Sequence, residues 1–187
     1  MLKKMRGFTL IELLIVVAII GILAALLIPN ALEAIQKSKQ KSSMKEIMSI
    51  ATASADYITD HGDWALVTQN GPLVAATGIV PAIATFYLKI CPINDPWNNP
   101  YNVFCGQAAV TGELSGADSN DIGADDFAVS SWGRDKAAGP LQASTYTTGT
   151  PEAGFYNVSK MADFNNDLVC WNGNWVVGPR TALVTGS

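Results

Sequence analysis

The sequence predicts an α+β protein, in which one long N-terminal α-helix packs on a small antiparallel β-sheet. Three observations predict this fold class. Residues 8–28 are almost entirely apolar and contain one charged residue, Glu12. Residues 29–61 continue with apolar side chains at helical spacing. From Gly62 onward, Gly, Pro, Asn and Asp divide the chain into short apolar runs that are typical of strands.

Composition and charge exclude several classes of protein. The chain has 187 residues, of which 15% are charged and 49% are apolar. An average soluble chain carries about 25% charged residues. Because this chain has fewer charges and many apolar residues, it is not expected to be mainly disordered. The net charge of −4 argues against a nucleic-acid-binding surface. The only histidine is His61, which argues against His-based catalysis and His-rich metal sites.

Residues 8–28 have the length of a membrane span. Twenty-one residues at about 1.5 Å each form a helix of about 31 Å, the thickness of a bilayer core. Lys3, Lys4 and Arg6 precede it, so the N-terminus is expected in the cytoplasm and the remaining chain outside it. A secretory signal peptide has a shorter core and an A-x-A cleavage site, which is missing here. A simple anchor fits the length but leaves Glu12 unexplained.

Glu12 requires a positively charged partner. A carboxylate in the membrane costs several kcal/mol unless it is paired or lies near the interface. Cleavage between Gly7 and Phe8 would create an α-amino group four residues from Glu12. That amine can neutralise Glu12 of a neighbouring copy during assembly, or Glu12 of its own chain before assembly.

The string GFTLIE at residues 7–12, followed by LLIVVAIIGILAALLIP, resembles the N-terminus of the type IV pilin and pseudopilin superfamily. The resemblance covers about residues 1–35. It implies that a prepilin peptidase cuts after Gly7 and N-methylates Phe8. It also implies that Glu12 guides the addition of subunits to a filament.

Gly21 and Pro29 match the positions at which helices of this superfamily kink or melt in filaments. Proline removes one backbone hydrogen bond, and glycine lowers helix stability by about 1 kcal/mol relative to alanine. Both residues are also common in ordinary membrane helices.

Residues 29–61 are expected to form an amphipathic helix that ends at His61 and Gly62. A gap in its apolar stripe falls at Ser38 to Ser43. The stripe consists of Ile28, Leu32, Ile35, Met44, Ile47, Ala51, Ala55 and Ile58. The lysines between them form either a solvated face or a patch that meets lipid headgroups or an acidic neighbouring subunit; they are Lys37, Lys39, Lys41 and Lys45.

Residues 62–187 are expected to form the globular domain, outside the cytoplasm. Residues 82–90 are expected to form a short helix. The two segments 106–126 and 137–151 have the composition of loops. The strongest strand patterns are Tyr101–Phe104, Phe127–Ser131 and Leu168–Val177.

Further strings extend the resemblance to the major pseudopilin of type II secretion. DPWNNPY at residues 95–101 resembles the DPWGNPY turn of that family, with Asn98 at the usual glycine. Asparagine is the residue next best suited to positive φ. SWGRD at residues 131–135 and DFNNDLV at residues 163–169 resemble the segments that approach each other around a calcium ion in these relatives. The resemblance implies four candidate ligands: Ser131, Asp135, Asp163 and Asp167.

Calcium suits this set because it binds six to eight oxygen atoms. The alternative is an acidic turn without a metal, since Asp and Asn favour turns in any case. Residues 136–162 also form a longer and more irregular loop than the compact loop of the family.

The chain has three cysteines, all in the expected exported part. Cys91 and Cys105 flank the DPWNNPY turn and can close a loop of about 15 residues, worth about 3 kcal/mol. Cys105 and Cys170 are the competing pair if their strands are neighbours. A zinc site is not expected, because CxxC spacing is missing.

These features together predict a structural subunit of a type II secretion pseudopilus and not an enzyme, since the usual catalytic motifs are missing. The alternatives are a surface type IV pilus subunit for adhesion or motility, and a membrane-tethered binding domain that does not polymerise. The expected partners are other copies, prepilin peptidase, an inner-membrane assembly platform, minor pilins or pseudopilins, and the membrane, but no nucleic acid. The precursor is expected to cross the inner membrane once with its C-terminal domain in the periplasm. It would then enter a periplasmic pseudopilus or an extracellular pilus.

Overall fold

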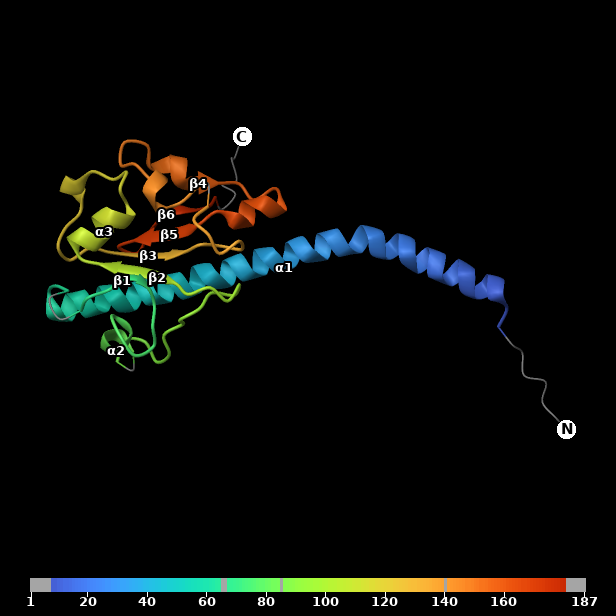
Figure 1. Ribbon diagram of the computed structural model, residues 1–187, viewed down its shortest axis with the longest axis horizontal. Helices are drawn as coiled ribbons and strands as arrows, with labels where there is room; N and C mark the ends of the chain where they lie inside the picture. Colours follow the sequence, from blue (N-terminus) through green and yellow to red (C-terminus); the bar gives the residue numbers. More distant parts are fainter. Residues whose placement is uncertain (1–7, 65–66, 85, 140, 181–187) are drawn as a thin grey trace, which may run out of the picture. The chain divides into compact units, whose positions relative to one another are not determined.

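The computed structural model describes residues 8–64, 67–84, 86–139 and 141–180. It confirms an α+β fold with one long helix (Figure 1). The helices and strands are α1 (Leu10–His61), β1 (Asn70–Pro72), α2 (Val80–Ile83), β2 (Asn102–Cys105), α3 (Gln107–Glu113), β3 (Phe127–Ser131), β4 (Phe155–Tyr156), β5 (Leu168–Trp171) and β6 (Asn174–Pro179). The chain divides into two compact units between Lys37 and Ser38. The predicted domain boundaries at residues 7, 28 and 61 stay predictions.

The first unit is the apolar part of α1. Of the helices that the structure describes, α1 is the one long and apolar enough to cross a membrane. Its most apolar window has a mean hydropathy of 3.1, and none of that window is buried. Pro29 lies inside α1 without ending it. Such a continuous apolar surface needs lipid or other protein chains to cover it.

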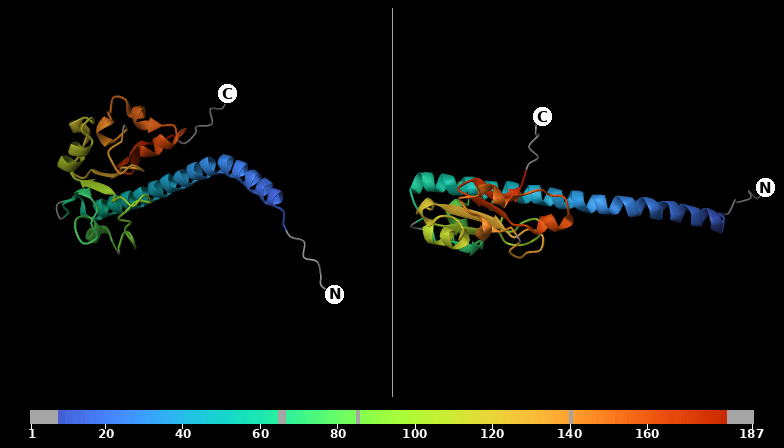
Figure 2. Two further views of the ribbon diagram at one scale, coloured as in Figure 1. Left: turned by 45° about the vertical axis from the view of Figure 1, so that its right-hand side comes forward. Right: turned by 90° about the horizontal axis from the view of Figure 1, so that it is seen from above.

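The second unit contains a six-stranded sheet in the order β1-β2-β3-β5-β6-β4. Neighbouring strands are antiparallel except for the parallel pair β4 and β6. The sheet lies alongside the second half of α1 in both views of Figure 2. The predicted small sheet on the amphipathic half of the helix is therefore confirmed, with one parallel pair added.

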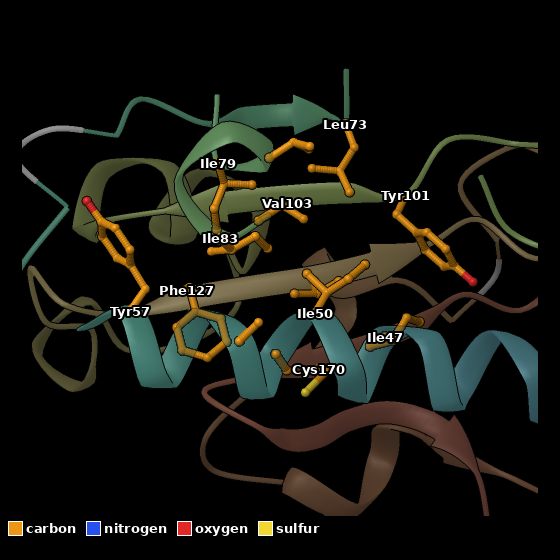
Figure 3. Packing of buried hydrophobic residues seen from close by; sticks show 14 of the residues in the cluster. Ile47, Ile50, Tyr57, Leu73, Ile79, Ile83, Tyr101, Val103, Phe127 and Cys170 are labelled. Atoms are coloured by element: carbon orange, nitrogen blue, oxygen red, sulfur yellow. The ribbon is translucent and has the colours of Figure 1, made fainter. Parts of the chain in front are cut away.

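The main core lies between α1 and the sheet. Figure 3 shows Ile47, Ile50 and Tyr57 of α1 directed toward this core. They pack in one buried cluster with side chains from the strands and from the segment around α2, among them Leu73, Ile79, Ile83, Tyr101, Val103, Phe127 and Cys170. The helix face that reaches the sheet thus carries large apolar residues three and seven positions apart, which is one face of an α-helix.

The predicted apolar stripe is correct at Ile47 and Ala51, which are buried, but wrong at Ala55, which is exposed. Steps of four residues turn the helix by 40° beyond a full circle, so a run of such steps drifts out of the core. The buried face instead passes through Ile50 and Tyr57.

Polar side chains fill the predicted gap between Ser38 and Ser43. Gln40 and Ser43 are both buried. The Gln40 side chain donates a hydrogen bond of 3.1 Å to the Tyr156 hydroxyl group. The Tyr101 hydroxyl group donates to Glu46 over 2.7 Å and lies 3.3 Å from the Ser43 hydroxyl group. The gap is therefore a buried contact of hydrogen-bonded groups.

Helix α3 lies in the segment that the sequence suggested was a loop, so that expectation is wrong. Val110 within α3 and Leu114 at its C-terminal end are fully buried in a second apolar cluster. This cluster also includes Phe104, Ala128 and Val169 of the sheet. Spacing of four residues between two apolar side chains was the signal for this helix.

The predicted strand at residues 168–177 is two strands, β5 and β6, joined by Asn172 and Gly173. These two residues have φ values of 48° and 82°, which a two-residue hairpin turn of type I′ requires. The helix predicted at residues 82–90 is the shorter α2, which begins near Pro81 and ends before the extended residue Ala84.

Candidate functional site

The start of α1 is closed by hydrogen bonds between Thr9 and Glu12. The Thr9 backbone N–H and hydroxyl group donate to one Glu12 carboxylate oxygen over 2.8 and 2.7 Å. The Glu12 backbone N–H lies 3.3 Å from the Thr9 hydroxyl oxygen, to which it donates. This reciprocal pattern is a capping box. The spacing T-x-x-E was its signal, and sequence reasoning overlooked Thr9.

The capping box gives the Glu12 carboxylate a partner within a single chain. A negative charge is also favourable here because the first turn of a helix carries partial positive charge. The Phe8 side chain is 78% exposed. Gly7 lies outside the described residues, so the predicted cleavage and methylation stay predictions.

The DPWNNPY string forms a tight turn around the buried carboxylate of Asp95. One carboxylate oxygen accepts hydrogen bonds of 2.9 Å from the backbone N–H groups of Trp97 and Asn99. The Asp95 backbone N–H donates to the carbonyl oxygen of Asn99 over 2.8 Å. Asn98 has φ 63°, as expected for a residue that replaces glycine.

The turn is bonded to the end of β3. The other Asp95 oxygen accepts a hydrogen bond of 2.8 Å from the Ser131 hydroxyl group, and the Gly133 backbone N–H donates to the same hydroxyl oxygen over 3.3 Å. The Lys136 ammonium group donates to the Asn98 carbonyl oxygen over 3.2 Å. These contacts fix the start of the loop that follows β3.

That loop lies against residues 164–167. The Arg134 backbone N–H donates to the Phe164 carbonyl oxygen over 2.9 Å, and the Gly139 backbone N–H donates to the Asp167 carboxylate over 2.9 Å. A Cβ atom at Gly133 would lie 2.8 Å from the carbonyl oxygens of Phe164 and Asn166. The structure therefore brings together the two segments that the family resemblance had linked.

The four predicted calcium ligands have different surroundings. The Ser131 hydroxyl group is bonded to Asp95, and Asp163 accepts hydrogen bonds of 2.7 Å from the backbone N–H groups of Ser159 and Lys160. Asp135 is exposed, whereas Asp167 is buried. Among the described residues, no three His, Cys, Asp or Glu side chains are grouped as a metal site requires. Calcium binding by this set stays a prediction.

Asp167 is a buried carboxylate with a raised pKa. Burial raises its pKa to about 7, and the charges of Glu113 and Asp135 act in the same direction. Burial also raises the pKa of Glu113, a residue that sequence reasoning missed. The ion pairs found within the described part of the chain do not include Asp167. The donor chemistry of Asp135 and Asp167 therefore fits a hard cation.

The three cysteines are free in the structure. Strand β3 separates β2 from β5, so Cys105 and Cys170 are two strand spacings apart, about 10 Å, which is too far for a disulfide. The condition for this competing pair is therefore not met. Pairing of Cys91 with Cys105 stays a prediction. Burial raises the pKa of the Cys91 thiol to about 11 and that of Cys105 to about 12.

An exposed apolar helix that starts with the Thr9–Glu12 capping box and is followed by a sheet-bearing domain is the architecture of a pilin-like protein. A family model described as the prokaryotic N-terminal methylation motif matches residues 2–28. The type II secretion system core protein G of Escherichia coli (strain K12) is 32% identical over 139 residues, 71% of this chain and 94% of the relative. Its counterpart in Pseudomonas aeruginosa is 34% identical, over 70% of this chain and 96% of the relative.

The chain belongs to the type II secretion system core protein G family. The member from Vibrio cholerae is 33% identical over 107 residues, 54% of this chain and 73% of the relative. No solved structure matches the chain.

Proposed function

We propose that the chain is a structural subunit of a type II secretion pseudopilus that polymerises through its apolar helix to support protein export. The observation that carries this proposal is the apolar part of α1, whose most apolar window is entirely unburied and whose first turn contains Glu12. Membership of the core protein G family supports the same role. The role is structural and needs no catalytic group.

The proposed precursor crosses the inner membrane once, with its globular domain in the periplasm. Prepilin peptidase cuts it between Gly7 and Phe8 and methylates Phe8, which agrees with the matched methylation motif. An inner-membrane assembly platform then adds the subunit to the filament, together with minor pseudopilins. Gly21 and Pro29 allow the helix to change shape locally as it leaves the lipid.

Glu12 has a different partner at each stage of this proposal. In the single chain its carboxylate accepts from Thr9 and caps the helix. In the filament it pairs with the α-amino group of Phe8 in a neighbouring copy. A buried carboxylate gains more from a full positive charge than from neutral donors, so the exchange favours assembly.

The proposal is tested with Glu12→Ala in the full chain, produced in cells with the secretion machinery. Cleavage of the leader is expected to continue, while filaments sheared from the cells and export of cargo are lost. The matched control is Thr9→Ala, which removes the capping hydroxyl group and keeps the acid. Thr9→Ala is expected to assemble. Filaments of normal abundance from Glu12→Ala would contradict the pairing, and equal loss from both variants would show that only helix capping matters.

We also propose that calcium binds where the loop after β3 meets residues 164–167. Of the four predicted ligands, Asp135 and Asp167 hold it together with backbone carbonyl groups, since Ser131 and Asp163 already make other hydrogen bonds. The raised pKa of Asp167 supports this because a bound cation would offset the cost of its buried charge. Chelation is expected to lower the Tm of the full chain in detergent, and Asp167→Ala should abolish that shift. Asp121→Ala changes an exposed acid in the turn at Ser119–Asp121, outside both segments of the proposed site, and should keep the shift. An unchanged Tm on chelation of the unmodified chain would remove calcium from the proposal.

A further inference from the structure

The exposed face of α1 in the second unit carries an ordered pattern of charge. Lys41 and Lys45 lie four residues apart, and Asp56 and Asp60 follow with the same spacing. All four side chains are exposed. We call these four residues the charge stripe. Both pairs are exposed on one continuous helix, and the negative pair is turned by about 60° from the positive pair around the helix axis.

The lysine pair and the aspartate pair of one chain are too far apart to form ion pairs with each other. Each lysine precedes its corresponding aspartate by 15 residues, which is about 22 Å along a helix and about 60° around it. An ion pair requires about 4 Å, and salt screens charges beyond about 10 Å. The ion pairs of the described chain do not involve the charge stripe. Asp60 accepts a hydrogen bond of 2.8 Å from the Tyr87 hydroxyl group, which carries no positive charge.

Exposed apolar side chains flank both ends of the charge stripe. Ile90 is 77% exposed and lines a pocket of about 320 Å³ together with Lys45 at the positive end. Phe86 is 80% exposed, and its ring centroid lies 4.8 Å from that of Tyr87. Tyr87 is hydrogen-bonded to Asp60 at the negative end. Between the two pairs the helix exposes small side chains, among them Thr52 and Ala55. A second helix can therefore approach closely.

We propose that the charge stripe is a contact between two copies of this chain, packed in parallel and displaced by about 22 Å along α1. The copy whose amine pairs with Glu12 is a different neighbour, since that pairing needs a displacement of only about 6 Å. Lys41 and Lys45 of one copy then face Asp56 and Asp60 of the next, and the exposed Phe86 and Ile90 lie beside the contact. This inference rests on the proposed function, since it describes how pseudopilus subunits recognise each other. The partner is a second copy because a shift of about 22 Å along α1 places the aspartates of one copy opposite the lysines of the other.

The geometry of the charge stripe favours an open assembly. An antiparallel pair would also match the charges, but copies anchored in one membrane by the same apolar helix point in the same direction. In the parallel pair, the two contacting faces differ by about 60° around the helix. Each copy therefore uses one face toward the copy ahead and another toward the copy behind. Such heterologous contacts repeat along a filament and do not close into a dimer.

The test reverses charges at each end of the charge stripe in the full chain. Lys41→Glu with Lys45→Glu, and separately Asp56→Lys with Asp60→Lys, are expected to reduce the yield of sheared filaments by at least about tenfold, since each places like charges together. The chain with all four changes has the original net charge and a self-complementary stripe, so it should regain filaments. Co-production of the two double variants should also restore them. Failure of both rescues would overturn the inference.

A zero-length carbodiimide cross-linker provides a second readout on filaments of the unmodified chain. It joins a lysine to a carboxylate in direct contact, so a Lys45–Asp60 product must link two copies, since about 22 Å separates these residues in one chain. Mass spectrometry of digested filaments should find this product. Its absence from filaments that form normally would overturn the inference while the proposed function stands. If the lysines contact lipid headgroups instead, Asp56→Lys with Asp60→Lys should not lower the yield of filaments, and this result would also overturn the inference. If the unmodified chain forms no filaments, the proposed function itself fails.

Discussion

The Ser131 hydroxyl group donates a hydrogen bond of 2.8 Å to the carboxylate of Asp95, and both residues are buried. This bond joins the turn at residues 95–99 to the end of β3. The same carboxylate holds the turn through the backbone N–H groups of Trp97 and Asn99. Asp95 therefore organises the turn and also fixes the loop that leads toward Asp167.

Ser131→Ala should lower the free energy of unfolding by about 1–3 kcal/mol, because it leaves a buried carboxylate oxygen without its donor. Ser130→Ala is the matched control. Ser130 is equally buried, but its hydroxyl group lies 3.5 Å from Glu113, a weak contact. Urea unfolding of the full chain in detergent, followed by tryptophan fluorescence, measures both variants. Equal losses would mean that the bond to Asp95 has no special weight.

Gly133→Ala should destabilise the protein more than Gly173→Ala. Both glycines have positive φ, 67° and 82°, so alanine strains the backbone by about 1–2 kcal/mol at either site. Only at Gly133 would the new Cβ atom also meet carbonyl oxygens, those of Phe164 and Asn166, at 2.8 Å. At Gly173 the new Cβ atom would meet no heavy atom within 4 Å outside the glycine and its two chain neighbours. The same unfolding assay compares them, and a Gly173→Ala loss as large as that of Gly133→Ala would argue against close contact of the two segments.

Asn98→Ala should cost about 1 kcal/mol, because alanine is poorly suited to the φ of 63° that this residue adopts. Asn98→Gly should be close to neutral, since glycine reaches that conformation freely. Thermal unfolding of the two variants checks the difference. An Asn98→Ala variant as stable as the unmodified protein would contradict the left-handed conformation of residue 98.

Asp167 should make the calcium-free protein less stable as pH rises from about 4 to 7. Its pKa is about 7 in the folded chain, above the ordinary value for aspartate of about 3.9. Between these values the folded state holds a proton that the unfolded state has released, so the contribution of this group to stability falls as pH rises. Asp167→Asn should flatten the dependence and be the more stable protein above pH 7 without calcium. Parallel curves for the two proteins, measured as Tm against pH with chelator, would contradict the raised pKa.

Features with local causes were predictable from the sequence. The apolar run fixes the first part of α1, strand β3 matches its predicted bounds, and Asn98 takes the conformation expected of a replaced glycine. Each depends on residue type and spacing within one short segment.

Other features depend on partners distant in the chain. Ala55 fits the helical pattern but faces solvent, because the position of the sheet selects which side of α1 is buried. The hydrogen bond of Asp95 with Ser131 joins residues 36 positions apart. The charge of Glu113 near Asp167 likewise arises only from packing of α3. Sequence spacing carries no record of such tertiary neighbours.

The mass of the mature N-terminus tests the central claim most directly, since assembly through Glu12 requires the amine that cleavage exposes. Protein purified from membranes should begin at Phe8, and its N-terminal peptide should carry one added methyl group. A mature chain that begins at any other residue, or that keeps residues 1–7, would place no amine four residues from Glu12 and would contradict the proposed assembly.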